Sequence, residues 1–139
     1  MVDPLNRRMH RDNLGGCAAV VYDFAQHGGV VGDIALDLKL PAGTIIKFNT
    51  IKVNDAFTSG GLATVAVKAE GAADLLAATA IASLTAGALV DGVADYTAAN
   101  MVELTEERAI TVTVATAALT GGSMVIYLDY YDRFNYSIS

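Results

Sequence analysis

The chain has 139 residues, a formal net charge of −6, 53% hydrophobic residues and a single cysteine, Cys17. This length fits one domain that folds around its own core, and a single thiol excludes both an internal disulfide and a zinc site built from several thiolates. The acidic side chains are scattered, so nucleic-acid binding by the body of the domain is not expected, because phosphate contacts need a basic face.

The N-terminal third predicts an irregular arm followed by strands. Residues 1–16 show neither helical nor strand periodicity and contain Pro, Asn and a Gly-Gly pair. A strand is predicted at 17–24 and a turn at 26–29. Residues 30–40 give the clearest strand pattern, because apolar and charged residues alternate strictly. The face predicted to point inward consists of Ile34, Leu36, Leu38 and Leu40.

The next segment predicts two strands joined by a loop. The apolar residues of 44–53 change parity near Asn49-Thr50, which indicates a β-bulge, since one extra residue reverses the two faces. Residues 54–61 are predicted to form a loop, and 62–69 a strand of small residues.

Residues 70–104 are the most ambiguous part of the chain. The Ala- and Leu-rich stretch 72–84 favours a short helical turn inside a loop, although its β-branched residues favour a strand. Residues 91–100 are polar and are predicted to form turns, and 101–104 a short strand.

The C-terminal third predicts an antiparallel hairpin of strands 109–115 and 124–131 around a turn at 119–122. The uncharged run 109–128 is long enough to span a bilayer, but its period of two is typical of strands, so no membrane partner is expected. All four Gly-Gly pairs are interpreted as turns. They lie at 15–16, 28–29, 60–61 and 121–122.

Seven or eight strands joined by turns predict an all-β fold, an antiparallel β-sandwich or jelly roll of about eight strands. The domain is expected to span residues 17–139, preceded by the irregular arm 1–16. No secretory signal is predicted, because the arm lacks an apolar segment.

Catalytic chemistry is not expected. The sequence contains no phosphate loop and no dinucleotide motif, and neither His10 nor His27 lies beside an orienting partner. The carboxylates considered for acid–base or calcium chemistry are Glu103, Glu106, Glu107, Asp129, Asp91 and Asp95. Their spacing is too weak for a calcium site, so we predict no enzyme, no cofactor and no metal.

Two features are candidates for interactions. The first is an aromatic cluster near the C-terminus, which predicts either a subunit interface or a cap on the core. Its members are Tyr127, Tyr130, Tyr131, Phe134 and Tyr136. The second is the arm, which predicts either contacts with an acidic neighbour or a frayed terminus. Its candidate contact residues are Arg7, Arg8, His10 and Arg11.

Four stretches carry a resemblance to a known group: 33–48 (DIALDLKLPAGTIIKF), 58–67 (TSGGLATVAV), 84–88 (LTAGA) and 107–130 (ERAITVTVATAALTGGSMVIYLDY). Together they resemble capsid decoration (cement) proteins of tailed bacteriophages with a jelly-roll fold. The resemblance covers about residues 30–131, and its motifs are structural turns and strands.

The resemblance implies a trimer that binds the capsid exterior, made in the host cytoplasm, with the N-terminal arm clamping neighbouring major capsid subunits. Two alternatives stay open. One is another jelly-roll virion component, such as a head fibre base, a collar or a tail protein. The other is a module that binds carbohydrate or a host surface, against which the absence of Trp counts mildly.

Overall fold

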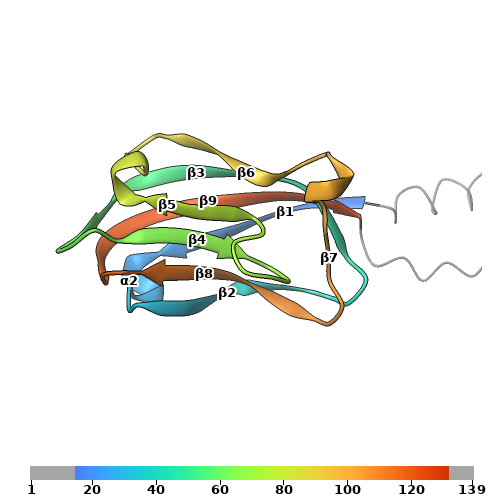
Figure 1. Ribbon diagram of the computed structural model, residues 1–139, viewed down its shortest axis with the longest axis horizontal. Coiled ribbons are helices and arrows are strands. Elements are labelled where there is room, and N and C mark those ends of the chain that lie inside the picture. The colour runs from blue at the N-terminus through green and yellow to red at the C-terminus, as the bar shows by residue number, and fades with distance from the viewer. Residues whose placement is uncertain (1–14, 132–139) are drawn as a thin grey trace, which may run out of the picture.

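The computed structural model describes residues 15–131 as a sandwich of two antiparallel sheets (Figure 1). Sheet A has the order β1–β9–β3–β6, with β7 paired to β3. Its strands are β1 (Gly15–Asp23), β9 (Leu119–Tyr131), β3 (Ile45–Ser59), β6 (Leu89–Asp95) and β7 (Val102–Glu103). Sheet B has the order β2–β8–β4–β5. Its strands are β2 (Gly32–Leu40), β8 (Arg108–Ala115), β4 (Thr64–Lys68) and β5 (Leu76–Ala80).

The pairing is that of a jelly roll, which confirms the predicted fold class. β1 pairs with β9, β2 with β8, β3 with β6, and β4 with β5, so the chain forms a nested set of antiparallel pairs. This long ribbon is rolled up, because β9 also pairs with β3 and β8 also pairs with β4. Consecutive strands therefore alternate between the two sheets over most of the chain.

Alternating side chains explain why these segments form half-buried strands. In β2 the side chains of Leu36 and Leu40 are buried, whereas Asp33, Asp37 and Lys39 are exposed. Ile34 and Leu38 pack against the same core from its margin. Each sheet buries one such face against the other, and the apolar surface removed from water there is the main stabilising contribution. The predicted faces of 30–40 are confirmed.

Strand β3 contains the predicted bulge and is longer than predicted. Its register against β9 shifts between Ile46 and Phe48, so the extra residue lies at Lys47, two residues before the expected change of parity. The predicted loop at 54–61 is wrong over its first part, since β3 continues to Ser59. Phe57 is buried in the core and keeps this polar stretch in the sheet.

The prediction of a helical turn within 72–84 is wrong for β5, and the turns predicted at 91–100 are wrong for β6. Ala-rich β5 has weak strand propensity, but pairing with β4 and burial of Leu76 override it. Short 3₁₀ helices follow these two strands, η1 (Ile81–Ser83) and η2 (Ala98–Asn100). The predicted strand at 101–104 is confirmed as β7.

The predicted C-terminal hairpin is wrong, because β8 lies in sheet B and β9 in sheet A. The chain crosses between the sheets at Thr116, whose φ of 75° is a left-handed conformation. Gly121-Gly122 lies inside β9 and not in a turn. Gly122 has a φ of 128°, and a Cβ placed there would lie 2.7 Å from the Phe57 ring. Of the other pairs, 15–16 lies within β1, and 28–29 and 60–61 lie in connections.

The link between β1 and β2 contains the helical turn α2 (Phe24–His27), where a turn was predicted at 26–29. Asp23 caps it by accepting a hydrogen bond from the amide of Ala25. The hydroxyl of the buried Tyr22 donates to the carbonyl of Gly28, and burial raises the pKa of Tyr22 to about 12.

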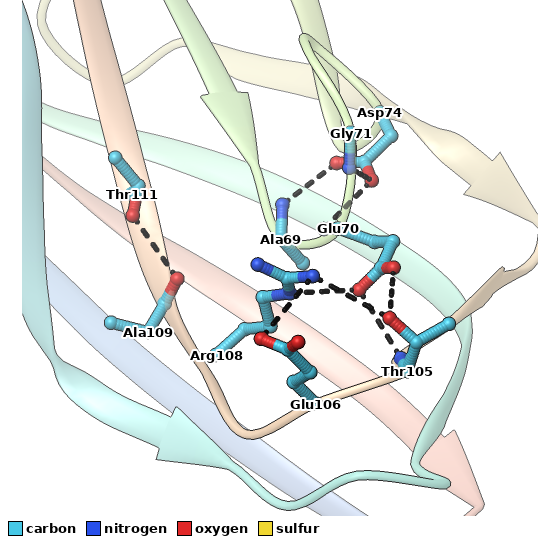
Figure 2. A network of polar contacts seen from close by, with 9 residues as sticks. All are labelled: Ala69, Glu70, Gly71, Asp74, Thr105, Glu106, Arg108, Ala109 and Thr111. Carbon is cyan, nitrogen blue, oxygen red and sulfur yellow. Dashed lines mark hydrogen bonds and ion pairs between the residues drawn. The ribbon is translucent and has the colours of Figure 1, made fainter.

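A polar network ties two loops together at one end of the sandwich (Figure 2). The Glu70 carboxylate accepts hydrogen bonds from the amide and hydroxyl of Thr105 and from Nε of Arg108 at 2.9 Å. The Asp74 carboxylate accepts three amides of the β4–β5 loop. Gly15 pairs with Tyr131, so the first and last described residues lie side by side. Both are near this end of the sandwich (Figure 1). No helix among residues 15–131 is long and apolar enough to cross a membrane.

Candidate interaction surface

The outer face of sheet A carries most of the exposed aromatic side chains. In β9 the inward residues Met124, Ile126 and Leu128 are buried, so Tyr127 and Tyr131 point away from the core. Tyr127 and Tyr131 are 46% and 42% exposed, values that leave a large part of each ring available for contact.

The register places small residues beside these rings. Ala19 of β1 and Thr50 of β3 lie opposite Tyr127 on its two sides. Cys17 and Phe48 flank Asp129 in the same way. Because Ala19 and Thr50 have small side chains, they leave the ring of Tyr127 uncovered. The outer face of sheet A therefore offers an exposed aromatic side chain to a partner.

Four residues lie around the carboxylate of Asp129 on this face, and together with Asp129 they form a cluster of five. We call it the Asp129 cluster: Lys47, Phe48, Tyr96, Asp129 and Tyr131. The hydroxyl of Tyr96 donates to Oδ2 of Asp129 at 2.9 Å, and Nζ of Lys47 lies 3.8 Å from Oδ1. The same Nζ lies 4.2 Å from the centre of the Tyr131 ring, a cation–π contact. The carboxylate thus has both a donor and a cation beside it.

Tyr96 is held in this cluster by its backbone. Its φ of 69° is left-handed, a conformation that costs a residue with a side chain roughly 1–2 kcal/mol. The amide of Tyr96 donates to the carbonyl of Lys47 at 2.7 Å, and its ring stacks on Phe48 with centroids 4.9 Å apart. The next turn is fixed by Asp95, whose carboxylate accepts from the amide of Thr97 and from Asn100. Backbone strain of this kind is often retained at sites of function.

The hydrogen bond to Asp129 raises the pKa of Tyr96, and burial and the negative charge of Asp129 act in the same direction. The phenol therefore stays a neutral donor throughout the physiological range. The Asp129 cluster presents aromatic rings around a paired charge, an arrangement suited to non-covalent contact with a protein surface.

The predicted interface residues are divided by the structure. Tyr127 and Tyr131 lie on the outer face of sheet A. Tyr130 lies on the opposite side of β9 and packs against the core, with its ring over Gly16. Two predicted residues, Phe134 and Tyr136, lie outside the described residues, as do the arm residues Arg7, Arg8, His10 and Arg11.

Sequence reasoning missed Lys47, Phe48 and Tyr96. The bulge in β3 decides which of its residues face outward, and Tyr96 lies within the segment 91–100 that was predicted to form turns. A signal existed for Tyr131, which belongs to the aromatic concentration near the C-terminus, and for Asp129, which falls on the polar side of the last predicted strand. The cluster is produced by strand register and could not be read from spacing.

The described residues that were considered for catalysis do not lie together in one site. The His27 side chain is 8% exposed, and its Nδ1 accepts a hydrogen bond from the amide of Asp23 while its Nε2 lies 3.7 Å from the Asp37 carboxylate. Asp91 and Asp95 lie in β6 and not in a loop. Within residues 15–131, no group of three or more metal-ligating side chains lies together.

Three solved structures share this fold over most of the chain. A chain from the capsid of Ralstonia phage GP4 is 22% identical with a TM-score of 0.62, covering 89% of each chain. A chain from the acid-stable capsid of Helicobacter pylori bacteriophage KHP30 is 15% identical with a TM-score of 0.58, covering 87% of this chain and 90% of that one. A chain from the capsid asymmetric unit of cyanophage Pam1 is 18% identical with a TM-score of 0.55, covering 86% of each. Neither a family model nor a curated protein sequence matches the chain.

Proposed function

We propose that this protein is a non-enzymatic structural component of a bacteriophage virion. In this proposal it binds the outside of the capsid as a homotrimer and stabilises the shell by clamping neighbouring major capsid subunits. The observation that carries the proposal is the fold shared with chains from three phage capsids, over at least 86% of this chain in each case.

The surface of the domain supports a binding role. The outer face of sheet A exposes aromatic rings, and the Asp129 carboxylate on this face already has a donor and a cation beside it, so a partner can cover that carboxylate without leaving it unpaired. Tyr127 and Tyr131 are our proposed subunit-interface residues on this face.

The arm supports attachment to the shell. Residues 1–12 carry Arg7, Arg8 and Arg11 against Asp3 and Asp12, a net charge of +1, so the rest of the chain carries −7. A basic arm on an acidic domain suits an acidic patch on the capsid. A protein that binds the assembled shell and not its free subunits stabilises the shell by mass action, and many copies multiply a modest affinity.

The test is sedimentation of the purified protein with particles that lack it. Replacing Arg7, Arg8 and Arg11 by Ala is expected to weaken attachment about tenfold, or ~1.4 kcal/mol. Added salt is also expected to weaken the attachment of the native chain, because salt screens the charges of the arginines. Lys39→Ala is the control, because it removes an exposed cation from the outer face of sheet B. Unchanged binding of the arginine variant would contradict the clamp, and no binding of the native chain would contradict the proposed function.

A further inference from the structure

Strand β1 is an edge strand without the features that normally protect a sheet edge. Within residues 15–131 it pairs with β9 alone, so the backbone groups on its other side face outward. Its register with β9 is unbroken over nine residues, from Gly15 to Asp23. It contains no proline, and its only charged residue is the last one. Such an edge is a template for pairing with another strand.

The other edge strands differ from β1. The register of β2 is broken between Ala35 and Lys39, and three of its nine side chains are charged. The register of β6 is broken opposite Phe48 and Thr50. The remaining edge strands are short: β5 has five residues, and β7, which pairs with β3 alone, has two. Bulges, charges and short length are the usual ways to prevent edge pairing, so β1 stands apart in lacking all three.

The side of the sandwich next to β1 is incompletely covered. β1 and β2 are neighbouring edges of the two sheets. Ala18 of β1 points inward but is only half-buried, and Ile34 and Leu38 of β2 are partly exposed at the margin of the core. A strand added to β1 with apolar side chains on its inner face would cover these residues.

The last residues of the chain have the pattern of such a strand. After Asp132 and Arg133 the sequence reads FNYSIS, in which Phe134, Tyr136 and Ile138 alternate with Asn135, Ser137 and Ser139. Strict alternation is typical of a strand with one apolar face. At about 3.3 Å per residue, the eight residues after Tyr131 reach about 26 Å, close to the length of β1.

We propose that residues 133–139 of one copy pair with the free edge of β1 in a neighbouring copy. A chain's own tail would first have to reverse around Gly15, which lies opposite Tyr131, and would use several of its eight residues in that turn. A neighbour's tail needs no reversal. The exchange joins two different surfaces, an arrangement that forms a ring where the rotation between copies closes and an open filament where it does not. The trimer of the proposed function requires the closed ring. This inference rests on the trimer in the proposed function and identifies what holds the trimer together.

Charge and parity in the tail give a matched pair of variants. Tyr136→Asp places a carboxylate among the alternate positions that carry apolar side chains. It is expected to reduce the solution mass from three chains to one. Ser137→Asp adds the same charge one residue later, at one of the positions that carry polar side chains. It is expected to leave the solution mass at that of three chains. The measurement is light scattering on the eluting protein. Equal masses for the two variants would overturn the proposed pairing.

Hydrogen exchange locates the contact. In the full chain, the β1 amides that point away from β9 are expected to exchange at least tenfold more slowly than in a chain ending at Asp132. Equal exchange would overturn the inference, and so would slow exchange in a chain that is a monomer, because the tail would then pair within its own molecule. Sedimentation with particles separates this outcome from the proposed function, since the chain ending at Asp132 keeps the arm.

Discussion

The hydroxyl of Tyr96, the residue that follows β6, donates a hydrogen bond to Asp129 of β9, 33 residues further along the sequence. Tyr96 reaches this position in a left-handed backbone conformation, with its ring stacked on Phe48. Lys47 lies on the other oxygen of the same carboxylate. The outer face of sheet A is therefore arranged by specific contacts and is not simply the solvated side of a strand.

Tyr127 and Tyr130, on opposite faces of β9, are expected to behave differently when replaced by alanine. Tyr130→Ala removes a ring packed against the core and is expected to lower the free energy of unfolding by about 2 kcal/mol. Tyr127→Ala removes an exposed ring and is expected to leave the melting temperature nearly unchanged while weakening self-association. Thermal melting and light scattering on both variants check this. A large loss of stability in Tyr127→Ala would show that its ring belongs to the fold.

The buried amide of Asn49 is expected to stabilise the connection between β3 and β6. Its Nδ2 donates to the carbonyl of Leu75, and its Oδ1 accepts the amide of Ala94. The Leu75 carbonyl also accepts the amide of Val93, so Asn49→Ala leaves mainly the Ala94 amide without its partner. The expected loss is about 1–3 kcal/mol in urea unfolding. A variant as stable as the native chain would mean that water replaces the amide.

The glycine in the middle of β9 is expected to be required. Gly122→Ala forces a side chain into a φ of 128° and against Phe57, and an expected loss of about 1–3 kcal/mol follows from the overpacking alone. Gly60→Ala is the control, because a Cβ there meets nothing within 4 Å. Its stability is expected to be equal or slightly higher, since alanine restricts the unfolded chain. Urea unfolding that ranks the two variants in the opposite order would contradict this packing.

Stability at acidic pH is expected to depend on Glu70. Hydrogen bonds from Thr105 and Arg108 lower the pKa of Glu70 below its ordinary value of 4.5. A lowered pKa in the folded state means that this stabilisation is present above pH 4.5 and is lost as the pH falls through the folded pKa. Melting temperatures between pH 6 and pH 3 are therefore expected to fall less steeply in Glu70→Gln than in the native chain. Glu103→Gln, at an exposed position of β7, is expected to follow the native curve.

Much of the fold could be predicted, because alternation reports which face of a strand is buried. The alternation of β2, the bulge in β3 and the short strand β7 were all visible in the sequence. Alternation does not report which sheet a strand joins, so β8 and β9 were predicted to pair although they lie in opposite layers. Helix propensity misled the prediction at β5, where pairing with β4 outweighs the preference of its alanines.

The candidate surface was only partly predictable. Tyr127 and Tyr131 were found because aromatic residues concentrate near the C-terminus. Lys47, Phe48 and Tyr96 were not, since their positions depend on the register of three strands and on one left-handed residue. Spacing along the chain carries no information about such cross-strand neighbours.

The most direct test of the proposed function is quantitative mass spectrometry of purified phage particles produced from a genome that encodes this chain. The account predicts that the chain is present in many copies per particle, in a fixed ratio to the major capsid protein. Its absence from particles that contain the other structural proteins would contradict a virion role.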